Sequence, residues 1–81
     1  MAKVVLWGSL KKAAGGKTEL DLDVSGVREL LAELGERYPK LGPQLDAGVS
    51  VSIDGTMVRD NLFVAIEPGS EVYVLPRMAG G

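Results

Sequence analysis

Cysteine and histidine are both missing from the 81-residue sequence. Without cysteine, the chain can hold neither a disulfide framework nor a cysteine-ligated iron–sulfur cluster. Without histidine, it lacks the side chain that most often acts as a general base or metal ligand near neutral pH. Most schemes of nucleophilic, acid–base and metal catalysis are therefore excluded, and we expect no metal site. The candidate reactive group that remains is the α-carboxylate of Gly81.

A strong charge of either sign is also missing, because nine basic and eleven acidic residues give a formal net charge of −2. No basic patch stands out, so we expect no nucleic-acid partner. No apolar run approaches the roughly 20 residues that a membrane helix needs, and no signal peptide is evident. These absences predict a cytoplasmic protein with no membrane partner, and the length predicts one small domain.

Two segments near the N-terminus predict a hairpin. Residues 3–7 form a short run of strand-forming residues that is apolar on both faces, as in a central strand. Residues 17–24 alternate between apolar and mostly charged side chains, as in a half-buried strand. Between them, residues 10–14 can form one helical turn before Gly15 and Gly16 bend the chain back.

A helix is predicted between residues 25 and 39. Ser25 is a favoured N-cap residue and stands just before a helical pattern. Pro39 ends the helix, because proline disfavours helical backbone in the residue before it. A loop follows over residues 40–48, and two of its leucines are expected to tuck onto the core. The apolar face of the helix comprises Val27, Leu30, Leu31, Leu34 and Tyr38.

The C-terminal half of the chain predicts three further strands. Residues 49–53 alternate in polarity, Asp54-Gly55 predicts a tight turn, and residues 56–58 form a short partner strand. After a loop, residues 71–75 form the last strand. Because the first and last strands are apolar on both faces, we expect them to be adjacent in the centre of the sheet.

These elements predict an α+β fold, in which a mixed sheet of four to five strands carries one main helix on one face. One helix cannot cover both faces of the sheet. The second face then carries Val5, Trp7, Tyr73 and Leu75, an exposed apolar patch of the kind that marks an interaction site. The alternative is that the loops at residues 8–16 and 56–70 fold over this face.

Residues 77–81 are predicted to form a flexible tail after a domain of residues 1–76. Ala79, Gly80 and Gly81 are nearly free of side chains, and such a segment can thread a narrow channel. A carboxylate becomes a reactive acyl donor when it is converted to an acyl-adenylate, and glycine is the least hindered acyl group. The pattern therefore suggests that Gly81 is activated on a nucleotide α-phosphate. The alternative is an inert terminus.

Two charged clusters are explained by surface structure better than by a ligand. Glu19, Asp21 and Asp23 share one face of the second strand, where they keep an edge solvated; a hard-cation site is the alternative. Lys11-Lys12 is too small a basic spot to bind phosphate.

With these features, the sequence resembles the ubiquitin-like β-grasp sulfur carriers, which include the small subunit of molybdopterin synthase and the thiamine-pathway sulfur carrier. The likeness covers the whole chain in length and element order. It is most specific at residues 68–76, where the turn, last strand and proline resemble the DGDEV segment of that family, and at the terminal Gly80-Gly81.

The resemblance implies that an E1-like enzyme uses ATP to adenylate the Gly81 carboxylate. Persulfide sulfur then replaces AMP and leaves a C-terminal thiocarboxylate, from which the sulfur passes to an acceptor on another protein. Gly80 and Gly81 would form the carrier end of a protein that is not itself an enzyme and binds no cofactor. Its expected partners are the activating enzyme and a sulfur-acceptor enzyme like the large subunit of molybdopterin synthase. The residues expected to contact them are Trp7, Tyr73, Leu75, Pro76, Arg77, Met78 and Ala79.

The resemblance favours molybdopterin synthesis, because that subgroup often carries an aromatic residue like Trp7 and an apolar residue like Leu75 before the tail proline. The loop at residues 10–15 is also similar to that subgroup. Arg77-Met78 departs from the commoner second proline and small apolar residue, which leaves thiamine or cysteine synthesis open. A modifier joined to lysines through isopeptide bonds, or a binding module with an inert tail, are further alternatives. The missing cysteines exclude the β-grasp ferredoxins.

Overall fold

The computed structural model describes residues 1–58 and 63–76, so the predicted tail at residues 77–81 lies outside the described residues. Within the described part, none of the helices is long and apolar enough to cross a membrane. The elements, in chain order, are β1 (Ala2–Leu6), α1 (Ser9–Ala13), β2 (Glu19–Leu22), α2 (Val27–Arg37), a 3₁₀ turn η1 (Pro39–Leu41), α3 (Gly42–Ala47), β3 (Val49–Ile53), β4 (Thr56–Met57) and β5 (Glu71–Pro76).

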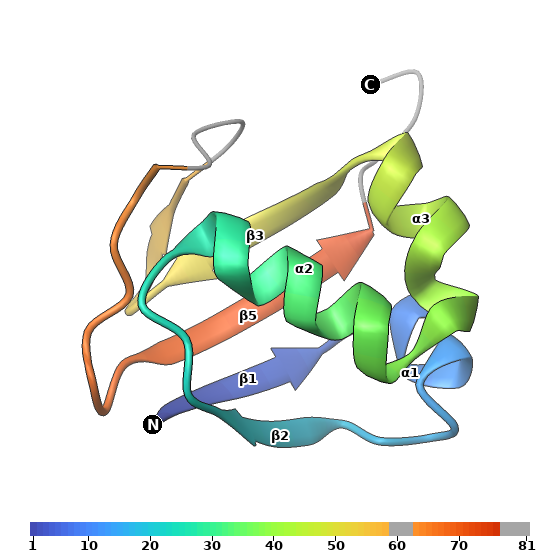
Figure 1. Ribbon diagram of the computed structural model, residues 1–81, viewed down its shortest axis with the longest axis horizontal. Coiled ribbons are helices and arrows are strands. Elements are labelled where there is room, and N and C mark those ends of the chain that lie inside the picture. Colours follow the sequence, from blue (N-terminus) through green and yellow to red (C-terminus); the bar gives the residue numbers. More distant parts are fainter. Residues whose placement is uncertain (59–62, 77–81) are drawn as a thin grey trace.

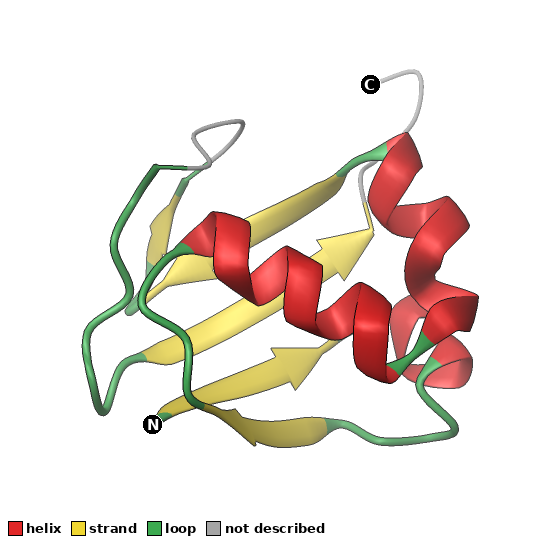
Figure 2. Cartoon of the chain, in the orientation of Figure 1, coloured by secondary structure: helices red, strands yellow, loops and turns green. Residues whose placement is uncertain are grey.

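The strands form one five-stranded sheet in the order β2-β1-β5-β3-β4. β1 and β5 are parallel neighbours in its centre, and the other pairs are antiparallel, which confirms the predicted mixed sheet. Figure 1 shows α2 lying across one face of this sheet, with α1 and α3 at one end. The predicted α+β architecture is confirmed. Figure 2 shows the long helix on one face of the sheet and the shorter helices at one end, so that no helix covers the second face.

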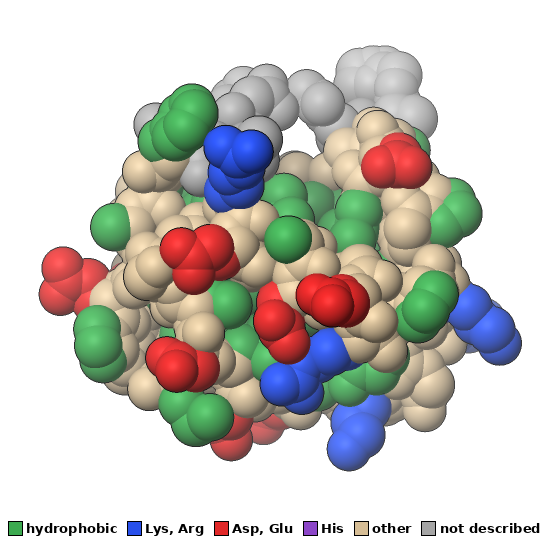
Figure 3. Space-filling view, viewed as in Figure 1, with side chains coloured by type: hydrophobic (Ala, Val, Ile, Leu, Met, Phe, Trp, Pro, Cys, Tyr) green, Lys and Arg blue, Asp and Glu red, His purple; other side chains and the backbone are tan. Residues whose placement is uncertain are grey.

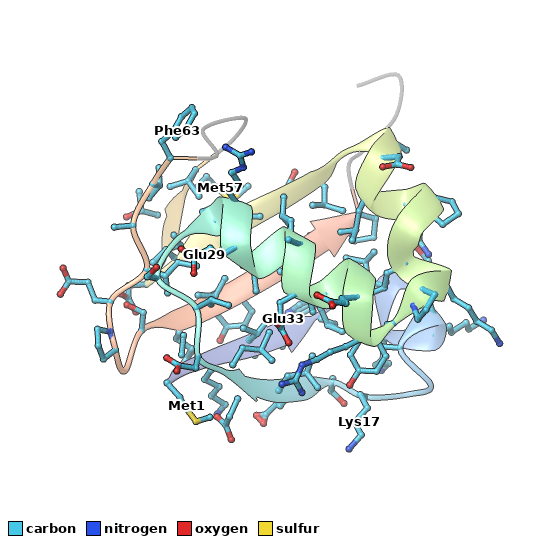
Figure 4. The ribbon with its side chains drawn as sticks, in the orientation of Figure 1. Met1, Lys17, Glu29, Glu33, Met57 and Phe63 are labelled. Carbon is cyan, nitrogen blue, oxygen red and sulfur yellow. The ribbon has the colours of Figure 1, made fainter. Side chains whose placement is uncertain are left out.

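The core lies between α2 and the sheet face that it covers. Leu30 and Leu34 of α2 are fully buried there, whereas Leu31 packs at the edge and is only partly buried. On the outer side of α2, the Arg37 guanidinium donates to the Glu33 carboxylate at 2.6 Å. Figure 3 shows acidic side chains on this solvent side, and Figure 4 labels Glu29 and Glu33 there. The buried strand side chains are Ala2, Val4, Leu6, Leu22, Val51, Val72 and Val74.

The N-cap prediction for α2 is wrong, because Gly26 and not Ser25 occupies the cap position. Gly26 pairs with Ala65 in an isolated antiparallel bridge, and the Val27 N–H donates to the Val64 carbonyl at 3.0 Å. The backbone of a distant loop therefore accepts a hydrogen bond from the first turn of the helix, a role that was expected for the Ser25 side chain. Ser25 instead donates its hydroxyl to the Glu29 carboxylate at 2.7 Å.

The segment after Pro39 was predicted to be a loop, but it forms η1 and the helix α3. Pro43 lies in the first turn of α3, where proline is compatible with a helix because the missing N–H would have no partner there. The expected leucine contacts are confirmed: Leu41 is fully buried and Leu45 packs against the core. Pro39 ends α2 as predicted, with Tyr38 in a non-helical conformation.

Asp54, in the predicted Asp54-Gly55 turn, also binds the chain at the start of β5 through hydrogen bonds. Asp54 adopts a left-handed backbone at φ 49° and accepts hydrogen bonds from the Glu71 N–H at 2.9 Å and the buried Ser70 hydroxyl at 3.0 Å. Asp54→Ala is therefore expected to destabilise the fold by roughly 1–3 kcal/mol, because it leaves these donors without their partner. Asp54→Asn retains an acceptor oxygen and a tolerance for this backbone, so chemical denaturation should show a smaller loss. Equal losses for the two variants would contradict this role of the side chain.

Candidate functional site

The candidate site begins on the sheet face that no helix covers. The register between β1 and β5 places Val5 beside Tyr73, and the register between β5 and β3 places Ser50 beside Leu75. Directly opposed residues of neighbouring strands point to the same face, so these side chains share one surface. We call Val5, Trp7, Tyr73 and Leu75 the apolar patch; it coincides with the set predicted from the sequence.

Trp7 and Tyr73 form the accessible centre of the apolar patch. Their ring centroids are 6.3 Å apart with the planes tilted by 57°, a favourable aromatic geometry. Trp7 follows the last residue of β1, yet its N–H still donates to the Val74 carbonyl at 3.0 Å, which holds its backbone beside β5. Trp7 is nevertheless 52% exposed. The alternative in which loops bury this face is therefore wrong for Trp7.

Sequence reasoning missed one residue on this face. Met57 of β4 lies opposite Ser52, and Ser52 lies opposite Tyr73, so one row of side chains crosses from β1 to β4. Met57 is 52% exposed and extends the accessible apolar surface toward the sheet edge. Counting residues across the two-residue Asp54-Gly55 turn would have revealed this pairing.

The margins of the apolar patch are charged. At one margin the Lys3 ammonium lies 3.1 Å from the Glu19 carboxylate, and this contact raises the pKa of Lys3 above its usual value. The described residues contain no group of three or more acidic side chains that could hold a metal ion, so the alternative of a hard-cation site at Glu19, Asp21 and Asp23 is not supported. At the other margin a depression of about 220 Å³ is lined by Val5, Leu6, Trp7, Gly8, Lys11 and Thr18.

The Tyr73 hydroxyl donates a hydrogen bond to the Glu71 carboxylate, and this bond raises the pKa of Tyr73 above its usual value. A raised folded-state pKa stabilises the fold below the unfolded pKa of about 10, and the gain disappears as the pH rises through the folded pKa. We therefore expect Glu71→Gln to lower the pKa of Tyr73 in an ultraviolet titration. An unchanged titration curve would contradict this coupling.

A second depression, of about 280 Å³, lies at the start of α2 and is lined by Ser25, Gly26, Arg28, Glu29, Phe63, Val64 and Ala65. Phe63 is 85% exposed, and Figure 4 shows it at the end of the molecule away from the tip of β5. This depression is therefore separate from the apolar patch, and sequence reasoning assigned Phe63 no role.

The apolar patch leads directly to the predicted tail. Leu75 and Pro76 end β5, and both are partly buried. All the predicted partner contacts stay predictions, and five of the predicted site residues lie outside the described residues: Arg77, Met78, Ala79, Gly80 and Gly81. The structure thus places Trp7, Tyr73 and Leu75 on one face of the sheet, close in sequence to Pro76, where the described residues end.

Comparisons with known proteins agree with this arrangement. A profile of the ThiS family matches residues 4–81. The solution structure of small archaeal modifier protein 1 from Methanosarcina acetivorans is 27% identical, with a TM-score of 0.81 over 99% of this chain and 95% of that one. A putative molybdopterin converting factor, subunit 1, from Pyrococcus furiosus is 24% identical, with a TM-score of 0.75 over 95% and 97% of the two chains.

A third solved structure, the BexX/CysO complex of Amycolatopsis orientalis, contains a chain that is 20% identical, with a TM-score of 0.80 over 100% of both chains. The likenesses at 24% and 20% identity show the shared fold. The search of curated proteins gave no match.

Proposed function

This chain belongs to the ThiS family, and on that basis we propose that it carries sulfur as a thiocarboxylate on Gly81 in the synthesis of a cofactor, with molybdopterin as the favoured product. Its family groups it with small ubiquitin-like carriers, which are not catalysts themselves. The observation that carries the proposal is the family match through Gly80-Gly81, on a chain whose apolar patch ends at Leu75, one residue before Pro76.

The proposed chemistry begins at the Gly81 carboxylate. In the active site of an E1-like enzyme, a carboxylate oxygen attacks the α-phosphorus of ATP, pyrophosphate leaves, and an acyl-adenylate forms. A persulfide sulfur of the donor then attacks the acyl carbon and AMP leaves, which gives an acyl disulfide. A thiol reduces that sulfur–sulfur bond and releases the thiocarboxylate, while the donor and the thiol are left as a disulfide.

In this cycle, the described residues would provide the surface that binds the partner enzyme. The partner would cover Trp7, Tyr73 and Leu75, because large exposed aromatic and apolar groups supply most of the free energy at protein interfaces. The five residues after Pro76 can span at most roughly 17 Å when extended, so the reacting phosphate must lie within that distance of the docked fold. A glycine-rich end suits a channel too narrow for side chains.

The sulfur acceptor is proposed to be an enzyme like the large subunit of molybdopterin synthase. The aromatic Trp7, the apolar Leu75 before the proline, and the fold shared with the Pyrococcus furiosus molybdopterin converting factor support this choice. A second candidate function is protein modification through isopeptide bonds at Gly81. It is favoured by the 27% identity to the archaeal modifier protein, and it requires the same adenylation.

Incubation with an E1-like enzyme, ATP and a persulfide donor tests the proposal. Intact-protein mass spectrometry should show the mass gain of one oxygen-to-sulfur exchange, only when ATP is present. A lysine-bearing acceptor protein in the same reaction tests the second function, because a modifier would give covalent adducts visible on a denaturing gel. Adenylation followed by adducts alone, without the sulfur mass gain, would overturn the carrier proposal.

A further inference from the structure

Gly8 lies close to Pro76, the residue that precedes the predicted tail. Leu6 of β1 pairs with Val74 of β5. Two residues further along both strands, the same parallel register places Gly8 beside Pro76. A Cβ atom added at Gly8 would lie 3.0 Å from the Cγ and 3.4 Å from the Cδ of the Pro76 ring. The closer of these distances is tight enough that the ring would have to move by a few tenths of an ångström.

The hydrogen-bond ladder cannot hold Pro76 on this side, because proline has no N–H to donate. The last ladder bond between these segments runs from the Trp7 N–H to the Val74 carbonyl, two residues earlier. Beyond that bond, the ring of Pro76 occupies the space beside Gly8 that a Cβ atom there would enter, while Val49 pairs with Pro76 on the other side.

Glycine is required at position 8 for a second reason. Its backbone, at φ 61° and ψ −136°, is one that residues with a Cβ rarely adopt, and it turns the chain out of β1 and into α1. Gly15 also has a positive φ, of 71°, but an added Cβ there would meet nothing within 4 Å. The two glycines therefore differ in the contact with Pro76, which makes Gly15 a useful control.

We propose that Gly8 is a positioning residue for the carrier tail: its missing side chain lets Pro76 lie against the end of β1 and thereby fixes the point from which residues 77–81 extend. The inference rests on the proposed adenylation of Gly81. It matters because five residues give little spare reach, and a misplaced reacting group lowers the rate of the chemical step more than it weakens docking.

The test compares Gly8→Ala with Gly15→Ala in ATP–pyrophosphate exchange by the activating enzyme, with rates expressed per folded molecule. Gly8→Ala should lower kcat on the order of tenfold and leave KM nearly unchanged, because the apolar patch is intact. Gly15→Ala should leave both constants at their wild-type values. A kcat of Gly8→Ala equal to that of Gly15→Ala would overturn the inference.

The double variant Gly8→Ala/Pro76→Ala separates the ring contact from the backbone strain at position 8, and Pro76→Ala alone, which keeps Gly8, tests the same contact if Gly8→Ala folds poorly. If the ring contact is responsible, Gly8→Ala should reduce kcat much less when position 76 is alanine. Equal reductions in both backgrounds would refute the contact. Absence of exchange with the wild-type chain would instead refute the proposed function. The amide NMR shifts of Val49 and Leu75 then still test the contact, since only Gly8→Ala should move them.

Discussion

Deletion of Gly81 is expected to abolish ATP–pyrophosphate exchange with the activating enzyme. Activation needs a carboxylate at one fixed distance from the docked fold, and deletion withdraws that group by about 3.5 Å, the length of one extended residue. Misplacement of a reacting group by even about 1 Å can cost 100-fold in rate, so a loss below detection is expected. Addition of one residue after Gly81 should have the same effect, because it moves the carboxylate beyond the reacting phosphate.

Stability provides the control for these tail variants. Thermal melting should be unchanged, because the core that the structure describes is built from residues before position 77. A variant with one residue added before Met1, which is 71% exposed, has the same length as the extended chain and should retain full exchange. Undiminished exchange by the chain extended after Gly81 would show that the terminal carboxylate is not the reacting group.

Much of the fold could be predicted, because its strongest determinants are local in sequence. The apolar runs that form β1 and β5 lack a polar face, so they had to be central, and the structure makes them parallel neighbours. The spacing of Leu30 and Leu34 identified the buried face of α2. The remaining exposed set on the sheet followed by elimination, since one helix covers only one face.

The features that were missed depend on contacts between residues distant in sequence. Gly26 became the cap of α2 because the backbone around Val64 supplies the hydrogen bonds, and no local pattern reveals that loop. α3 is short and begins with Gly42 and Pro43, which are usually signals for a loop. The role of Gly8 depends on Pro76 at the far end of the chain, so the sequence around Gly8 indicates only the end of a strand.

The candidate site was therefore predictable in composition but not in shape. Trp7, Tyr73 and Leu75 were identified from alternation along two strands, and the structure brings the first two into ring contact. Met57 was missed because its strand has only two residues and its face depends on pairing with Ser52. A patch that crosses four strands offers a wider docking surface than the predicted two-strand set.

Trp7→Ala is expected to separate docking from folding. Trp7 is half exposed, and its contact with the Tyr73 ring contributes about 0.5–1.5 kcal/mol beyond the area that its side chain buries, so the loss of stability should stay below that of a core truncation. As the aromatic centre of an interface, the same side chain should contribute roughly 2–4 kcal/mol to binding of the activating enzyme. Isothermal titration should therefore show an affinity loss of about 30-fold to 1,000-fold.

Leu34→Ala is expected to have the opposite effect: it should lower the stability of the fold and leave binding unchanged. Leu34 is fully buried on the sheet-facing side of α2, so its truncation should cost roughly 2–5 kcal/mol of folding free energy, a large fraction of the stability of so small a domain. Leu34 and the apolar patch lie on opposite faces of the sheet, so the molecules that remain folded should bind with wild-type affinity. Denaturant titration and calorimetry on the two variants should thus give opposite results. If Trp7→Ala lost several kcal/mol of stability while its folded fraction bound normally, Trp7 would belong to the core and the docking surface would lie elsewhere.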